Sequence, residues 1–305
     1  MDVNVLNALM NLGAYLNNDI KDIYSGSNRM NSQGTALEFY VKDAYCNAFD
    51  TENIEEKIKI HEQYFSYLGN DSNPPDFVIK DGEGVEVKKL ESLTGQLQLN
   101  SSYPKNKLRQ SDSRISNECR TCDGGKWIEK DMMYSIGFIP KSSNKIKLLW
   151  FVDGEVYAAD DIVYKNVFER LSSIIETEFK GLTSKTNELA RFNKIDSRGL
   201  TDLRVRSMWL LQNPIKAFKD IILFDKENEF SVIAIIKKEK YEAYANKEEF
   251  EQFVQNSSYV EIENVTIPHP TNANAEEQVV VIHMAYKSLE ETREVSQGTE
   301  RLSLF

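Results

Sequence analysis

The sequence predicts an α/β protein whose core is a mixed β-sheet flanked by helices. Segments with strand and helix patterns are interspersed along the chain, without the strict alternation that builds an all-parallel sheet. No Pro-, Gly- or Ser-rich linker interrupts them, and 305 residues are enough for one large domain. We therefore expect a single domain over residues 1–305, with elaborations after about residue 150.

Two helices and a hairpin are expected in the N-terminal part. Apolar residues recur there at helical spacing, and in the second helix Leu37, Val41 and Ala44 would form the buried stripe. The hairpin follows a Pro-Pro pair and turns at 81–84, where Asp-Gly-Glu-Gly separates two apolar runs. These elements cover residues 6–16, 34–45, 76–80 and 85–90.

The rest of the chain alternates between short apolar runs and amphipathic stretches. Residues 147–152 are apolar after the first lysine and predict a buried strand, whereas 162–179 has the spacing of an amphipathic helix. Four further strands and one helix are expected, the strands at 221–224, 230–236, 259–267 and 279–284 and the helix at 241–254.

Composition places the chain among globular proteins of the cytosol. It has 37 basic and 48 acidic residues, and no apolar run approaches the roughly 20 residues of a membrane helix. The N-terminus lacks a basic leader with a cleavage site, and three cysteines do not form a disulfide framework. Lys and Arg nevertheless concentrate in two basic islands, residues 101–147 and 185–220, which can act locally despite the net charge of −11.

The hairpin carries the residues that suggest chemistry. Glu86 and Lys88 lie two apart on one strand and so project from the same face, while Val85 and Val87 point into the core. Asp76 begins the partner strand, which can bring its carboxylate beside Glu86. Two neighbouring carboxylates repel each other unless a divalent cation lies between them or one is protonated, and their oxygens suit Mg²⁺ or Mn²⁺. With an ammonium group beside them, they can support the attack of water on a phosphodiester.

The acidic-x-Lys tripeptide by itself is a weak signal. The chain contains others at 19–21, 55–57 and 178–180, and a solvated strand face is the plainer interpretation of such a tripeptide alone. Only 86–88 follows a Pro-Asp pair across a strand, a turn and a second strand. This context favours a functional site.

Pro75-Asp76 followed by Glu86-Val87-Lys88 resembles the signature of the PD-(D/E)XK nucleases. The resemblance implies a restriction-endonuclease-like fold, in which Asp76 and Glu86 bind Mg²⁺ and Lys88 positions the attacking water. The stretch 34–38 is similar to the first core helix of many such enzymes, so that Glu38 would be an auxiliary metal or water ligand. An exposed helical carboxylate is the alternative for Glu38.

Further stretches resemble the NgoPII-like type II restriction endonucleases, at 99–108, 119–120 and 130–137. This resemblance covers about residues 30–220, the expected catalytic core, and leaves the acidic part at about 221–305 as a C-terminal α/β elaboration. It implies a palindromic target of the GGCC type and a homodimer with one active site per DNA strand. It also implies a bacterial cytoplasm that contains a cognate DNA methyltransferase.

The basic islands offer candidates for DNA contacts. Small hydroxyls and cations that follow the catalytic strand suit phosphates, at Ser101, Ser102, Lys105, Lys107 and Arg109. Arg114 and Arg120 are candidates for bidentate contacts with guanine, the commonest specific base contact. The second island could clamp the DNA backbone or reach a groove, through Arg191, Lys194, Arg198, Arg204 and Arg206. For each of these residues a solvated surface charge is the alternative.

The sequence thus predicts a type II restriction endonuclease that hydrolyses double-stranded DNA with Mg²⁺, for which Mn²⁺ would substitute, leaving 5′-phosphate and 3′-hydroxyl ends. One alternative is a structure-specific repair or junction nuclease on the same core. Another is a non-catalytic DNA-binding protein, although a binder gains nothing from acidic groups that face phosphates. Cys119 and Cys122 have the spacing of half a zinc site, but two reduced cysteines in a loop are the favoured interpretation because further ligands are scattered.

Overall fold

The computed structural model describes residues 3–20, 33–100, 102–141, 143–222, 224–290 and 292. Within these residues the helices are α1 (Val5–Tyr15), α2 (Gln33–Cys46), α3 (Ile54–Tyr64), α4 (Asn117–Thr121), α5 (Gly154–Tyr157), α6 (Asp161–Glu178), α7 (Pro214–Ala217), α8 (Lys238–Ala243) and α9 (Lys247–Gln255). The strands are β1 (Phe65–Tyr67), β2 (Phe77–Ile79), β3 (Gly84–Leu90), β4 (Leu97–Leu99), β5 (Lys107–Arg109), β6 (Glu129–Phe138), β7 (Leu148–Asp153), β8 (Ala190–Phe192), β9 (Leu203–Val205), β10 (Trp209–Leu211), β11 (Phe230–Lys237), β12 (Val260–Pro268) and β13 (Glu276–Tyr286).

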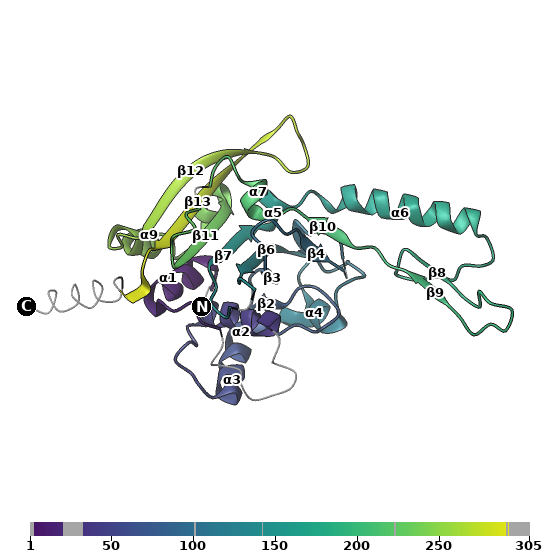
Figure 1. Ribbon diagram of the computed structural model, residues 1–305, viewed down its shortest axis with the longest axis horizontal. Helices are drawn as coiled ribbons and strands as arrows, with labels where there is room; N and C mark the ends of the chain where they lie inside the picture. The colour runs from purple at the N-terminus through teal and green to yellow at the C-terminus, as the bar shows by residue number, and fades with distance from the viewer. Residues whose placement is uncertain are drawn as a thin grey trace, which may run out of the picture.

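One large mixed sheet organises the described part of the chain (Figure 1). Its strand order is β1-β2-β3-β6-β7-β11-β13-β12, with β5 paired to β6 beside this path. Two pairs, β3 with β6 and β7 with β11, are parallel, and the other pairs are antiparallel. The prediction of a mixed sheet flanked by helices is therefore confirmed.

The two N-terminal helices cover one face of the sheet. The expected stripe of Leu37, Val41 and Ala44 is fully buried, and its helix α2 packs over β3 and β6. Gly137 of β6 makes this approach possible, because a Cβ atom there would lie 2.7 Å from Cδ2 of Leu37. A second apolar cluster fills the opposite face, around Trp150 and Ile235. Among the described residues, no helix is long and apolar enough to cross a membrane.

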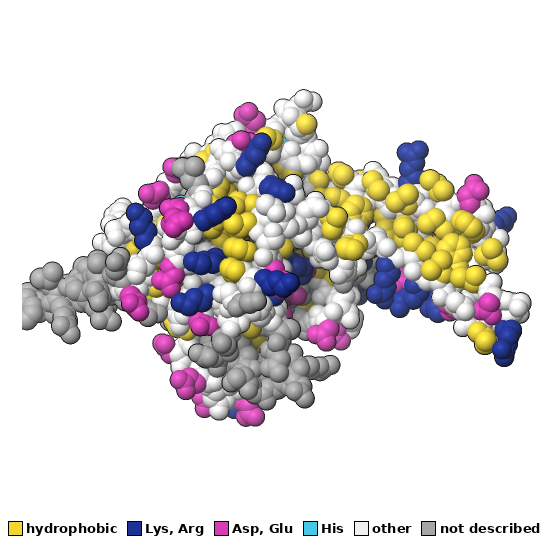
Figure 2. Space-filling view, in the orientation of Figure 1, with side chains coloured by type: hydrophobic (Ala, Val, Ile, Leu, Met, Phe, Trp, Pro, Cys, Tyr) yellow, Lys and Arg dark blue, Asp and Glu magenta, His cyan; other side chains and the backbone are white. Residues whose placement is uncertain are grey.

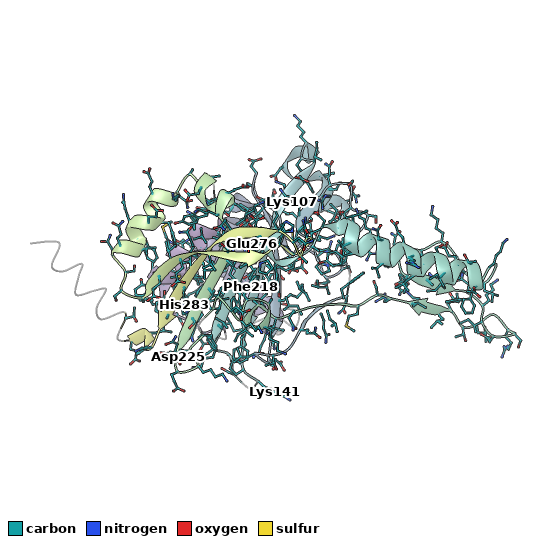
Figure 3. The ribbon with its side chains drawn as sticks, turned by 90° about the horizontal axis from the view of Figure 1, so that it is seen from above. Lys107, Lys141, Phe218, Asp225, Glu276 and His283 are labelled. Atoms are coloured by element: carbon teal, nitrogen blue, oxygen red, sulfur yellow. The ribbon has the colours of Figure 1, made fainter. Side chains whose placement is uncertain are left out.

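An arm projects from one end of this body. It consists of helix α6 and the small hairpin β8–β9, which follow each other in the chain and lie side by side away from the sheet in both views (Figures 1 and 3). Tyr164 near the start of α6 anchors the arm, with ring centroids 5.8 Å from Tyr103 and 5.5 Å from Trp209. The predicted amphipathic helix at 162–179 is thus present, but it packs on the hairpin of the arm and not on the sheet.

Two predicted elements differ from the structure. The run predicted as a strand at 221–224 is turn and irregular chain at its described residues, where its apolar side chains pack on the second apolar cluster without pairing to a strand. The helix predicted at 241–254 is divided into α8 and α9, because Asn246 between them hydrogen-bonds to Asn4 and Asn7 at the start of α1.

Candidate active site

The predicted hairpin is formed by β2 and β3, and it brings Asp76 and Glu86 together with Lys88. Asp76 precedes β2, and its Oδ2 accepts a hydrogen bond of 2.6 Å from the backbone N–H of Val87. This bond fixes the carboxylate beside the stretch of β3 that carries Glu86 and Lys88. Val85 and Val87 point into the apolar core on the other face of β3, as the alternation predicted.

Lys88 lies between the two carboxylates. Its Nζ is 2.6 Å from Oε1 of Glu86 and 3.8 Å from Oδ2 of Asp76. Burial lowers the pKa of Lys88, but the attraction of Glu86 and Asp76 outweighs burial, so the pKa is raised and the ammonium form is favoured. The site therefore holds a permanent cation directly beside two acidic groups.

Glu86 retains an unused ligand atom. The residue is only 8% exposed, and its Oε2 is buried without a hydrogen-bond partner among the described residues. Burial raises the pKa of Glu86, and the neighbouring Asp76 raises it further, while Lys88 lowers it. An unpartnered buried carboxylate oxygen is costly unless a proton or a cation compensates it. Hard oxygen donors of this kind fit Mg²⁺ or Mn²⁺.

Glu38 faces the same site from helix α2. Oε1 of Glu38 accepts a 2.6 Å bond from Nζ of Lys42, one helical turn later, and this ammonium also donates to the carbonyl of Leu68. Burial raises the pKa of Glu38, and Asp76 contributes to the rise. Lys42 was not among the predicted site residues. Its spacing of four residues from Glu38 was the available signal, but such pairs are common on exposed helices.

A buried ion cluster anchors α2 behind Glu38 and Lys42. Asp43 accepts bonds from Nζ of Lys57 and, at 2.7 Å, pairs with Nε2 of His61, both on helix α3. Asp43, Cys46 and His61 form the one cluster of three metal-ligand side chains within 4.8 Å found in the described residues. Because the ammonium of Lys57 already compensates Asp43, we interpret this cluster as a structural support of α2.

Asp76, Glu86 and Lys88 line a cavity of about 150 Å³. Ser102 and Lys105 also line this cavity, where the Ser102 hydroxyl is buried without a partner among the described residues. Lys105 is buried rather than exposed, since its ammonium pairs with Asp112 and lies 4.7 Å from the ring centre of Tyr103. Ser101 lies outside the described residues.

The remaining cations of the first island do not reach this cavity. Lys107 on β5 has three carboxylates within 3.6 Å, and it lines a separate cavity of about 630 Å³. Arg109, two residues later, lies 3.6 Å from Asp161 at the start of α6. Arg120 on α4 donates to the backbone carbonyls of Gln110 and Asp112, which closes the loop before α4.

Arg114 and Arg206 line a third cavity, of about 330 Å³, between the body and the arm. The loop that precedes Asp76 forms one wall of both this cavity and the acidic one, and Asn100 is also common to them. The guanidinium of Arg114 lies 4.6 Å from the ring centre of Phe168 on α6. Asn100 and Asn187 add side-chain amides to the lining of this third cavity.

The second island lies on the arm, away from the acidic cavity. Arg204 and Arg206 both pair with Glu188, at 2.5 and 2.8 Å, in an exposed setting. Arg198 is exposed in the connection between β8 and β9. Exposed ion pairs contribute little free energy, so a phosphate can replace Glu188 as the partner of these guanidinium groups.

Cys119 and Cys122 are free and buried, and no third metal-ligating side chain accompanies them within the described residues. A hydrogen bond from Cys119 lowers the pKa of Cys122 to about 7. The two thiols therefore lie at the C-terminal end of α4, and not in a loop as the sequence suggested.

Comparisons with known proteins agree with the geometry. The family model described as NgoPII restriction endonuclease matches residues 3–268. A curated relative, "Type II restriction enzyme NgoPII" of Neisseria gonorrhoeae, is 37% identical over 273 residues, which cover 88% of this chain and 95% of that protein. No solved structure matches the chain.

Proposed function

Because the chain belongs to the NgoPII restriction endonuclease family and is therefore a site-specific endonuclease, we propose that it hydrolyses both strands of DNA with Mg²⁺ at the hairpin site. Mn²⁺ would substitute for Mg²⁺. The products would carry 5′-phosphate and 3′-hydroxyl ends, and the target would be a palindrome of the GGCC type, as the sequence resemblance implies. A homodimer, with one site for each strand, suits such a target.

The juxtaposition of Asp76, Glu86 and Lys88 carries this proposal. Asp76 and Glu86 would hold the cation, with Oε2 of Glu86 as a free ligand atom and Glu38 as a nearby third carboxylate. When bound, Mg²⁺ neutralises charge on the phosphate and makes a water molecule more acidic. The ammonium of Lys88 can donate hydrogen bonds to the attacking water and orient it toward phosphorus. The water oxygen would then bond to phosphorus as the bond to the 3′-oxygen breaks, with the water losing a proton to solvent and the 3′-oxygen taking one up, which gives the 5′-phosphate and the 3′-hydroxyl.

We propose two kinds of DNA contact around this site. Arg198, Arg204 and Arg206 on the arm would contact phosphates, and so would Ser101 and Ser102 after the catalytic strand. Lys105, Lys107 and Arg109 are less suited to this role, because each is already paired with carboxylates. Arg114 lies at the cavity next to the acidic site, which supports a contact with guanine. Arg120 is less suited to this role, because its guanidinium already binds two backbone carbonyls.

Digestion of a plasmid of known sequence tests the proposed function. Protein treated with a chelator should be inactive, and addition of Mg²⁺ should restore cleavage to discrete linear fragments at GGCC sites. Ligation and end labelling should identify 5′-phosphates. Discrete fragments from cleavage at another sequence would reject only the GGCC target and would leave the proposed chemistry in place. Cleavage restricted to branched DNA would favour a junction nuclease, and full activity in the chelator would reject the metal requirement.

Substitution of arginines should separate phosphate contacts from base contacts. Arg198→Ala should weaken binding similarly for all sequences and reduce the salt slope by about one unit, because one fewer counterion is released. Arg114→Ala should cost roughly 1–3 kcal/mol of binding free energy on the cognate duplex and little on random DNA. Fluorescence anisotropy at two salt concentrations measures both effects.

Lys226→Ala is the matched control for these two variants. Lys226 is exposed in the turn next to Asp225, at the opposite end of the molecule from the arm (Figure 3). Its replacement should leave affinity unchanged on both duplexes. Equal losses on cognate and random DNA for Arg114→Ala would show that this residue does not distinguish bases.

A further inference from the structure

Exposed apolar side chains are concentrated on the arm. Figure 2 shows them as a continuous yellow band along it, with Lys and Arg mainly at its lower edge and tip. Among the described residues, Ile128 is the one large hydrophobic residue with high exposure outside the arm and the segment that leads back from it. The others are Ile162, Val163, Val167, Leu171, Ile174, Phe179, Leu182, Ile195, Leu200, Leu203, Met208 and Leu210.

Helix α6 carries the clearest part of this surface. Its 18 residues include none that is buried, although apolar residues follow helical spacing along it. Val163, Val167, Leu171 and Ile174 recur at intervals of four, four and three residues, so they form one stripe, and each is 41–52% exposed. The stripe is turned by about 100° or more around the helix axis from the side bonded to the hairpin, where Ser172 donates to the Leu189 carbonyl.

An uncovered helix of this kind is poorly supported by its own chain. Helical propensity alone contributes little in water, and most helices are stabilised by packing of their apolar face. The apolar side chains of the arm, each about half exposed, present on the order of 1,000 Å² of surface. The largest apolar patch of a monomer is usually about 300–600 Å². A standard interface buries roughly 800 Å² on each partner, so the arm offers enough area for a stable interface.

We propose that the apolar face of the arm binds the same face of a second copy of this chain, with the α6 stripe at its centre. This inference rests on the proposed function, since it names the surface that joins the proposed homodimer. The apolar stripe does not suit phosphates, whereas a two-fold pair of identical helices can bury it on both copies at once. Each described chain contains one carboxylate–lysine site, and a duplex offers two antiparallel strands. Two copies joined through their arms supply one site for each strand.

This arrangement assigns different roles to the two sides of the arm. Arg198, Arg204 and Arg206 belong to the hairpin, whereas the stripe belongs to the outer side of α6. Pairing through the apolar face would cover apolar side chains of the hairpin as well as the α6 stripe, but it would leave the Lys and Arg at the lower edge of the arm (Figure 2) and the cavity beside Arg114 free for DNA. The interface and the DNA contacts can therefore coexist.

Sedimentation measures the proposed interface. The wild-type chain should be a dimer at micromolar concentration, and Val167→Glu/Leu171→Glu should be a monomer, because four charges would enter the apolar contact. Both positions are half exposed, so the circular dichroism spectrum should be unchanged, which would show that the double variant is folded. Ile128→Glu is the control: it adds one negative charge per chain, against two in the double variant, at the exposed apolar site outside the arm and should remain a dimer.

Two results would overturn the inference: a monomeric wild-type chain, or a double variant that remains dimeric. Asp76→Asn separates this test from that of the proposed function, since it should abolish cleavage and leave the dimer intact. A wild-type dimer that dissociates in the double variant, but shows no metal-dependent cleavage, would reject the proposed chemistry and keep the interface. Metal-dependent cleavage by a monomeric wild-type chain would keep the proposed chemistry and reject the interface.

Discussion

Glu86→Gln should lower the rate of DNA cleavage by about a thousandfold, because a cation ligand and its charge contribute several kcal/mol of transition-state stabilisation. The amide keeps the size of the side chain but removes the negative charge that a divalent cation requires. Asp76→Asn should have a similar effect. Since each change also removes negative charge near phosphates, affinity for the cognate duplex should be retained or slightly increased.

Single-turnover cleavage and binding in the presence of Ca²⁺ provide the two readouts for these variants. Glu91→Gln is the matched control, since Glu91 is an exposed carboxylate that follows the same strand and pairs with Lys89 at the surface. It should cleave at nearly the wild-type rate. If Glu86→Gln also cleaves at nearly the wild-type rate, Glu86 is not a metal ligand.

The part of the site that could be predicted from the sequence is the part encoded locally. In a strand the side of each residue follows from its position, so Glu86 and Lys88 on one face and Val85 and Val87 on the other were predictable. The turn residues between the two strands identified the hairpin partner, and this was enough to bring Asp76 to the same place.

Lys42 could not be predicted as a site residue, because its role depends on tertiary placement. Its ammonium reaches the site region only because α2 packs over β3 and the carbonyl of Leu68 comes near. The central strand β6 was also missed, since Ser135 and Gly137 interrupt its apolar pattern. The strand forms nevertheless, because β6 is paired on both sides, with β3 and with β7. The glycine at 137 leaves the space that Leu37 of α2 occupies.

The basic islands show a different limit of sequence analysis. Lys105 and Lys107 count as free cations in a sequence, yet in the structure each is paired with carboxylates from other elements. A local excess of Lys and Arg therefore predicts a basic segment but not which of its cations is available to DNA. The same limit applies to the arm. The apolar spacing at 162–179 predicted a helix, but it could not show that no other element of the described chain packs on its apolar stripe.

Lys88→Met should lower the cleavage rate by about a hundredfold to a thousandfold, as expected when a group that orients the nucleophile is lost. Methionine keeps the length of the side chain but removes the ammonium that lies 2.6 Å from Glu86. Binding of Mn²⁺, measured by calorimetry, should persist and even strengthen, because the two carboxylates no longer share their charge with a permanent cation. Lys89→Met is the control on the same strand, since alternation directs Lys89 to the opposite face, and it should cleave normally. If Lys88→Met lost both cleavage and Mn²⁺ binding, the ammonium would be needed to keep the carboxylates in place; if it kept both, another residue would orient the water.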